Sequence, residues 1–362
     1  MFYLPVRIIF GANAVRKSFV FINRLGKRAL LVTSKHAAKA SGALDDVQNL
    51  FADLNIDYYI YDQVEENPVL ETITTGAAVF GEQNCDFVIG IGGGSPLDAA
   101  KAISLAAANH LDQSTLYDLA KIKKSFPVVA IPTTAGTGSE VTQYSVLTNA
   151  ETKVKAGFGH ECAFPVLALD DAKYTFSLSP KTTLYTAVDA LSHLLEGLYS
   201  KQRLPMIYPL IFQGVKLILD NLKPVLENPN DLQKRENLLL ASLYGGMAIA
   251  HTSTTFQHSI GYPLTAEFGL PHGLTNGLVL KPIMNLYYPS VKNELDALFA
   301  YLKTDKASFF NWLDSLELSA GIKITPEFVA AKTPEILSSR NMANNPVSVT
   351  AEDIAAVLQN IN

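Results

Sequence analysis

Two polar side chains interrupt an otherwise apolar helical pattern over residues 185–197, which reads YTAVDALSHLLEG. They are Asp189 and His193, and a spacing of four places both on one face of a helix, where they can reach a single ion. Two more imidazoles, His258 and His272, lie far downstream in short polar contexts. One carboxylate with three imidazoles suits iron or zinc better than magnesium or calcium, which prefer oxygen ligands.

The same four residues also fit structural roles. Asp189 and His193 can form a hydrogen-bonded pair on a helix surface, His258 can be a satisfied core histidine, and His272 can lie in a turn between proline and glycine. The chain has only seven histidines, and two of them fall within residues 258–273. That clustering favours a metal site, but spacing alone leaves both interpretations open.

A glycine-rich segment, residues 90–98 (GIGGGSPLD), follows a predicted strand and opens a predicted helix. Glycines let the backbone approach a ligand closely, and free N–H groups at a helix start favour a phosphate. Pro96 suits the first helical position. A capped turn, with Ser95 as the cap and Asp98 completing a capping box, is the structural alternative, although four glycines in five residues exceed what capping requires.

A second loop, residues 132–140 (PTTAGTGSE), follows the next predicted strand in the same way. Its hydroxyl groups and glycines can donate to a pyrophosphate or a ribose, or can simply form a polar turn. Two such loops at neighbouring strand ends favour a dinucleotide. Neither contains GxGxxG after the first strand, so an ordinary Rossmann fingerprint is not supported.

Alternation of short apolar runs with helical patterns predicts a doubly wound parallel sheet in an α/β domain over residues 1–178. Helical patterns alone predict an all-α domain over residues 179–362. The expected strands are residues 28–33, 57–62, 87–91, 127–131 and 166–169, between helices 43–54, 69–82 and 96–108. The expected later helices are 181–199, 206–226, 231–250, 273–287, 292–302, 306–319 and 350–361, the last with a capping box from Thr350 to Asp353.

Charge and composition exclude several classes of partner. A formal charge of −5 over 362 residues gives no basic field for nucleic acid or an anionic membrane. The longest apolar stretch, residues 238–250, is too short to span a bilayer, and residues 1–5 lack the features of a secretory signal. Cys85 and Cys162 form no CxxC pair. We therefore expect a cytoplasmic protein.

Together these residues resemble the iron-containing (group III) alcohol dehydrogenases, particularly the branch of 1,3-propanediol and butanol dehydrogenases. The resemblance covers nearly the whole chain. It rests on GGGSPLDAAK (92–101), PTTAGTGSEVT (132–142), VDALSH (188–193) and PHGLTNGLVL (271–280).

The resemblance implies the two-domain architecture of the dehydroquinate synthases, a homodimer, and a cleft between a nucleotide-binding and a metal-binding domain. It assigns Asp189, His193, His258 and His272 as ligands of Fe²⁺, with Zn²⁺ as the alternative. The implied cofactor contacts are Asn67, Gly93, Gly94, Ser95, Asp98, Thr133, Thr134, Thr137 and Lys155.

Two positions depart from the family pattern. Tyr262 stands where most members carry a histidine assigned to proton relay, so the relay would use Tyr262, the ribose hydroxyl, water or His251. Ser34 stands where members that use NAD often carry an acid. An uncharged residue there removes repulsion toward a 2′-phosphate, and Lys35 or Lys39 can attract one. We therefore expect NADP, with NAD as the alternative.

The implied reaction is reversible hydride transfer between a small primary alcohol or diol and the nicotinamide, with an aldehyde as product. A lyase like the dehydroquinate synthases is one rival, but residues 185–197 and 256–277 contain no Lys or Arg for a polyanionic substrate. A zinc enzyme like the glycerol dehydrogenases and a non-catalytic nucleotide-binding protein are the others.

Overall fold

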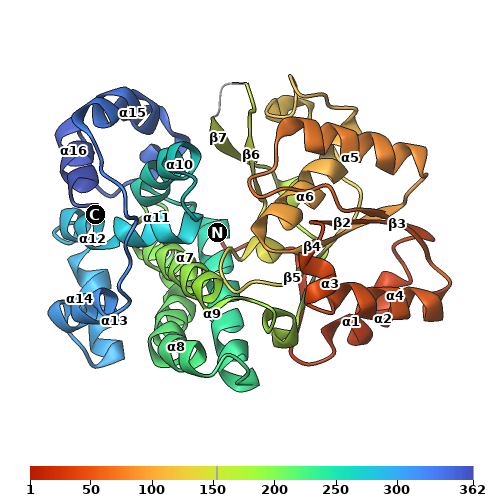
Figure 1. Ribbon diagram of the computed structural model, residues 1–362, viewed down its shortest axis with the longest axis horizontal. Coiled ribbons are helices and arrows are strands. Elements are labelled where there is room, and N and C mark those ends of the chain that lie inside the picture. The colour runs from red at the N-terminus through yellow and green to blue at the C-terminus, as the bar shows by residue number, and fades with distance from the viewer. Residues whose placement is uncertain (152–153, 362) are drawn as a thin grey trace.

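The computed structural model describes residues 1–151 and 154–361. Its first half is built on a parallel sheet with the strand order β1-β8-β5-β4-β2-β3, covered by helices on both faces (Figure 1). This confirms the predicted doubly wound α/β architecture. The strands of the sheet are β1 (Arg7–Phe10), β2 (Arg28–Thr33), β3 (Asp57–Tyr61), β4 (Phe87–Gly92), β5 (Val128–Pro132) and β8 (Leu167–Asp170).

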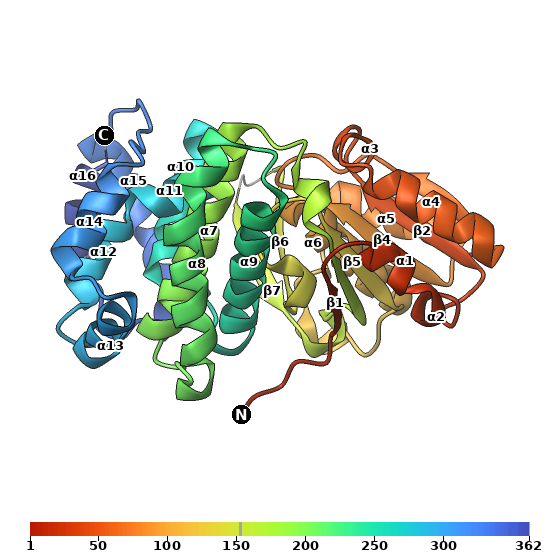
Figure 2. The same ribbon diagram turned by 90° about the horizontal axis from the view of Figure 1, so that it is seen from below.

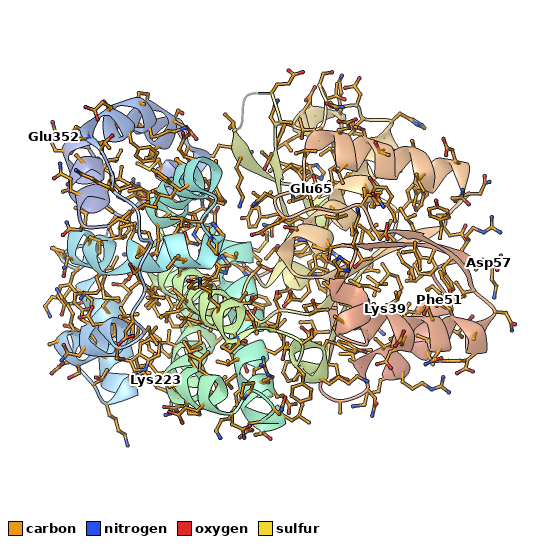
Figure 3. All side chains as sticks on the ribbon, viewed as in Figure 1. Lys39, Phe51, Asp57, Glu65, Lys223 and Glu352 are labelled. Atoms are coloured by element: carbon orange, nitrogen blue, oxygen red, sulfur yellow. The ribbon has the colours of Figure 1, made fainter. Side chains whose placement is uncertain are left out.

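Strand β2 shows why continuous apolar runs form the sheet. Its side chains alternate between two buried faces: Leu30 and Val32 pack with α5 (Leu70–Glu82) and α6 (Gly94–Asn109). Ala29 and Leu31 point the other way and pack against the remaining helices of this half. Phe51, labelled in Figure 3, contacts Phe87 of β4 on that second face. The helices there are α1 (Ala14–Lys17), α2 (Phe19–Ile22), α3 (Ala37–Ala40) and α4 (Ala43–Leu54).

The five predicted strands and helices α4 and α5 are confirmed to within one residue. Strand β1 was not predicted, nor was the antiparallel hairpin of β6 (Tyr144–Thr148) and β7 (Lys155–Gly159). Helix α6 begins at Gly94, so the prediction that Pro96 occupies the first helical position was wrong. Gly93 precedes that helix without a side-chain cap, and Ser95 instead accepts a hydrogen bond from the Asn67 backbone N–H.

The second half is helical and has its own apolar core. Helices α7 (Pro180–Tyr199), α8 (Tyr208–Glu227) and α9 (Leu232–Thr252) lie side by side next to the sheet (Figure 2). The capping box of α16 is present as predicted. The remaining helices are α10 (Phe256–Phe268), α11 (His272–Leu278), α12 (Leu280–Tyr287), α13 (Lys292–Leu302), α14 (Lys306–Asp314), α15 (Pro326–Ser338) and α16 (Ala351–Gln359).

Three predictions for this half were wrong. The helix expected over residues 306–319 ends at Asp314. The single helix expected over residues 273–287 is divided into α11 and α12. Helices α10 and α15 were not predicted, and each contains an internal proline, Pro263 or Pro334. Within the described residues, no helix has the length and apolar character that crossing a bilayer requires.

Candidate metal and nucleotide site

Helix α7 supplies the first two side chains of the site. It begins where Ser179 accepts a hydrogen bond from the Thr182 N–H, with Pro180 at the first helical position. From there it runs unbroken to Tyr199, and its central residues are buried. The spacing of four therefore presents Asp189 and His193 together on the face that meets α10 and α11.

The other two imidazoles come from helix starts that face this surface. His258 lies in the first turn of α10, and His272 is the first residue of α11. The Nε2 atoms of His193 and His258 are 3.0 Å apart, and Asp189 Oδ1 lies 4.0 Å from each. His272 Nε2 is 3.8 Å from the same oxygen. Ligand atoms of Asp189, His258 and His272 all lie within 4.8 Å of one another, the arrangement that a metal ion needs, and His193 Nε2 joins them through its contacts with His258 and Asp189.

Burial and charge suit these groups to bind a cation. Burial lowers the pKa of His193, and it lowers the pKa of His272 well below its ordinary value, with Lys155 acting in the same direction. Both rings are therefore neutral near pH 7, which metal ligation requires. Burial alone would raise the pKa of Asp189, but the facing imidazoles and the hydrogen bond from Asn276, which needs no charge on those rings, hold it below its ordinary value. The carboxylate is accordingly ionised.

Two residues that sequence reasoning missed also contact the cluster. Asn276, one turn beyond His272, donates from Nδ2 to Asp189 Oδ1 over 2.9 Å. Glu196 is buried, with Oε2 2.5 Å from His258 Nδ1. Both lie at helical spacing from the predicted ligands, three or four residues along the same helix. That spacing is the signal that could have identified them.

A cavity of about 950 Å³ connects the cluster to the carboxyl ends of the strands. From the glycine loop it is lined by Gly94, Ser95 and Asp98, and from the second loop by Thr137. Asp98 also accepts hydrogen bonds from Ser139 and from the Val146 N–H, so it joins α6 to the hairpin. The four clustered side chains line the same cavity.

Four predicted contacts of the nucleotide do not line this cavity in the described chain: Ser34, Gly93, Thr133 and Thr134. A Cβ on Gly93 would come within 3.2 Å of Thr134, so the two loops pack directly against each other. Thr133 is buried, and its N–H donates to the Gly92 carbonyl. Ser34 follows β2 and is half-buried, with exposed Lys35 beside it.

Lys155, Asn67 and Tyr262 lie close together in the lining of the cavity. Lys155 Nζ donates to Asn67 Oδ1 over 2.7 Å and lies 5.6 Å from the centre of the Tyr262 ring. That ring stacks on His272 with centroids 5.5 Å apart. Burial lowers the pKa of Lys155 to about 8, whereas burial raises the pKa of Tyr262. The phenol therefore stays protonated at neutral pH.

His251, the other side chain considered for a proton relay, has both ring nitrogens engaged. Nδ1 lies 2.7 Å from the Met247 carbonyl, and Nε2 accepts a hydrogen bond from the Tyr3 N–H. Its ring also stacks on Phe2. This histidine anchors the N-terminal segment, and it does not line the cavity within the described residues.

Comparison with known proteins gives a consistent result along the whole chain. Two family profiles match: Iron-containing alcohol dehydrogenase over residues 5–172, and Fe-containing alcohol dehydrogenase family, C-terminal, over residues 183–362. The chain is 31% identical over 372 residues to alcohol dehydrogenase 4 of Saccharomyces cerevisiae, covering 99% of this chain and 97% of the relative. It is 34% identical over 322 residues to the 1,3-propanediol dehydrogenase of Klebsiella pneumoniae, covering 87% and 82%.

Solved structures agree with these matches. An iron-containing alcohol dehydrogenase of Thermotoga maritima superimposes with a TM-score of 0.92 at 38% identity, covering 99% of this chain and 98% of that one. Relatives named for either nucleotide also match. The NAD-dependent methanol dehydrogenase of Bacillus methanolicus is 28% identical and covers 99% of both chains. The NADPH-dependent butanol dehydrogenase of Clostridium saccharobutylicum is 30% identical, covering 77% of this chain and 72% of the relative.

Proposed function

The chain belongs to the iron-containing alcohol dehydrogenase family and is a nicotinamide-dependent oxidoreductase, and we propose that Asp189, His193, His258 and His272 hold its catalytic metal. The observation that carries this proposal is that Nε2 of each of the three histidines lies within 4.0 Å of Asp189 Oδ1 in the wall of the cavity. Nitrogen-rich sets of this kind accept Fe²⁺ or Zn²⁺, and iron fits the family.

The substrate proposed for this site is a small primary alcohol or diol, oxidised reversibly to the aldehyde. When bound, the metal would supply Lewis-acid polarisation of the substrate oxygen, and the nicotinamide would accept the hydride. The chain supplies the placement: the glycine loop and Thr137 hold the nucleotide, and Lys155 lies where it can donate to a ribose hydroxyl.

For the alcohol proton we propose a relay that includes Tyr262. Its ring covers His272, so its hydroxyl is carried by the same wall of the cavity as the metal ligands. Because burial raises the pKa of this phenol, it acts as a hydrogen-bonded donor and acceptor and not as a stable tyrosinate. Lys155, with its pKa near 8, lies over the ring and can exchange the proton with the ribose.

NADP is the proposed nucleotide because Ser34 offers no negative charge at the end of β2. Lys35 and Lys39 are exposed on the segment that follows, and Lys39 is labelled on α3 in Figure 3. These two lysines could attract a 2′-phosphate, and the serine at position 34 carries no negative charge that would repel it. A domain boundary at 178/179, a cytoplasmic location and a homodimer complete the proposal, and they rest on the sequence and on the family.

His272→Ala tests the metal site. We expect the variant to lose bound metal and turnover of 1,3-propanediol or butanol while still binding nicotinamide, because the nucleotide loops are untouched. Metal content by elemental analysis and cofactor binding by fluorescence measure the two effects separately. The control is His110→Asn, which removes a histidine at the end of α6, where asparagine tolerates the same left-handed backbone. Full turnover in a metal-free His272→Ala protein would refute the ligand role.

The oxidation state of the cofactor after turnover distinguishes a dehydrogenase from the lyase alternative. An alcohol dehydrogenase accumulates one reduced nicotinamide for each aldehyde formed, whereas a lyase of the dehydroquinate synthase type returns its nicotinamide to the starting state. The family matches favour the dehydrogenase. We expect equal yields of aldehyde and reduced nicotinamide, measured by absorbance and by an aldehyde-trapping reagent.

A further inference from the structure

Glu196 has an unusual position for a charged side chain. It lies on α7 three residues after His193 and has no exposed surface. Its Oε2 atom is 2.5 Å from His258 Nδ1, the ring nitrogen that points away from the cluster. Both atoms are buried and neither has a hydrogen-bond partner in the described part of the chain, so this close ion-pair contact is the polar interaction that each makes. A buried carboxylate is costly unless it is paired, so this contact needs an explanation beyond packing.

The second oxygen of the same carboxylate binds the start of α10. Oε1 accepts hydrogen bonds from the N–H of Thr255 over 2.6 Å and from its hydroxyl over 2.9 Å. Thr255 caps α10, and His258 follows in the first turn. Glu196 therefore holds both the backbone that carries His258 and the far side of its ring.

We propose that Glu196 is a positioning residue that keeps the proton of His258 on Nδ1 and its Nε2 lone pair directed at the metal position. Nε2 lies 3.0 Å from the corresponding atom of His193, so the ring already faces the proposed ligands. An imidazole ligates only through an unprotonated nitrogen, and an acceptor beside the other nitrogen selects that tautomer. The proposal rests on the metal role assigned above to His258.

His258 alone receives this support among the described residues. The described chain places no carboxylate within ion-pair distance of Nδ1 of His193 or His272, whose ion-pair contacts with Asp189 are made through Nε2. The neighbour recorded for the His193 ring besides charged groups is the neutral Gly136 backbone. The tautomers of those two rings are therefore not selected by a charge. Loss of Glu196 should act on one ligand of the four, which predicts a weakened site and not an abolished one.

Glu196→Gln keeps the size of the side chain and removes only the charge and one acceptor. An amide has a single carbonyl oxygen, but Glu196 accepts hydrogen bonds from Thr255 with one oxygen and contacts His258 Nδ1 with the other. If the NH₂ group faces His258, Nδ1 must become the acceptor, and the proton moves to Nε2, where it blocks ligation. If the NH₂ group faces Thr255, two donors oppose each other at the helix start.

The experiment measures metal affinity by competition with a chelator and the tautomer of His258 by ¹⁵N spectra of imidazole-labelled, Zn²⁺-loaded protein. We expect Glu196→Gln to weaken Zn²⁺ binding by roughly 10- to 100-fold, the usual effect of removing such a partner, and to change the His258 nitrogen pattern. Nucleotide affinity should not change. Ser192→Ala is the matched control, because its buried hydroxyl lies between the ligands on α7 and donates only to the Asp189 carbonyl among its described contacts.

Unchanged zinc affinity in Glu196→Gln would overturn the proposal. So would weaker binding with the His258 proton still on Nδ1, because that result would assign Glu196 a structural role only. If the variant does not fold, the wild-type spectrum decides, since a neutral zinc-free His258 with its proton on Nε2 and none on Nδ1 contradicts the proposal directly. Failure of the metal assignment is distinguishable: wild-type protein would then bind no metal, or His258→Ala would retain full affinity.

Discussion

A methyl group added at Gly273 should separate the two helices that carry the metal ligands. Gly273 follows His272 in the first turn of α11, and a Cβ built there would lie 1.9 Å from the Tyr185 carbonyl oxygen on α7 and 3.2 Å from the Cβ of Asp189. The nearest neighbour is backbone in the first half of a long buried helix, so it cannot rotate away as a flexible side chain would. Gly273→Ala must therefore move α11.

The size of that movement follows from the contact distance. Real Cβ atoms essentially never approach a heavy atom closer than 3.0 Å, so α11 has to retreat from α7 by at least about 1 Å. Metal–ligand distances tolerate roughly 0.2 Å, and a misplacement of about 1 Å at a reacting centre costs on the order of 100-fold in rate. Overpacking of this kind also costs about 1–3 kcal/mol of stability.

We therefore expect Gly273→Ala to fold with a lowered melting temperature, to lose at least tenfold in metal affinity, and to lose on the order of 100-fold in kcat/KM. Chelator competition, thermal unfolding and steady-state kinetics measure these effects. Gly81→Ala is the matched control: Gly81 lies in the last turn of α5 with open space around it, and alanine there should leave activity unchanged and raise stability slightly. A Gly273→Ala enzyme with metal affinity and kcat/KM within threefold of wild type would refute the reasoning.

Four further predictions concern three residues: Ser34, Lys155 and Tyr262. Ser34→Asp should shift the ratio of kcat/KM for NADP over NAD toward NAD by at least tenfold, because a carboxylate repels the 2′-phosphate and accepts from the 2′-hydroxyl; an unchanged ratio in parallel assays contradicts this reading of position 34. Burial lowers the pKa of Lys155 to about 8, so its side chain is a charged ammonium below that pH and a neutral amine above it. Nucleotide affinity should therefore fall as pH rises through 8. The Lys155→Met variant should show no such fall. Because of the same shift, the folded chain holds fewer protons than the unfolded chain between pH 8 and 10.5, so Lys155 makes the free energy of unfolding rise with pH in that window. Denaturant unfolding of wild type and of Lys155→Met at several pH values measures this contribution. Tyr262→Phe should lower kcat by at least tenfold with unchanged metal content, and full activity by stopped-flow assay would exclude the phenol from the relay.

Local features that depend on residues close together in the chain could be predicted from the sequence. The apolar run of β2 predicted a strand buried on both faces, and both faces are covered. The capping box at Thr350 is present because it needs only residues three apart. The spacing of Asp189 and His193 placed them on one helical face for the same reason. The family resemblance, carried by long contiguous motifs, is confirmed along the whole chain.

Elements whose stability comes from distant partners were missed. Helix α10 contains Gly261 and Pro263, which disfavour a helix locally. It forms nevertheless in the described structure, where the Thr255 N–H at its start binds Glu196, about sixty residues earlier in the chain. The β6–β7 hairpin is likewise tied to α6 through Asp98, which accepts from the Val146 N–H.

The sequence by itself determined the composition of the site: which acids and imidazoles exist, and which of them share a helical face. Only the tertiary structure decided their meeting, because α7, α10 and α11 are brought together by packing between segments about eighty residues apart. The tertiary structure also determined the role proposed for Glu196. Its spacing of three residues from His193 is common in helices and gives no sign of the contact with His258. Helical periodicity acts over one or two turns, whereas a coordination sphere is assembled across the whole core.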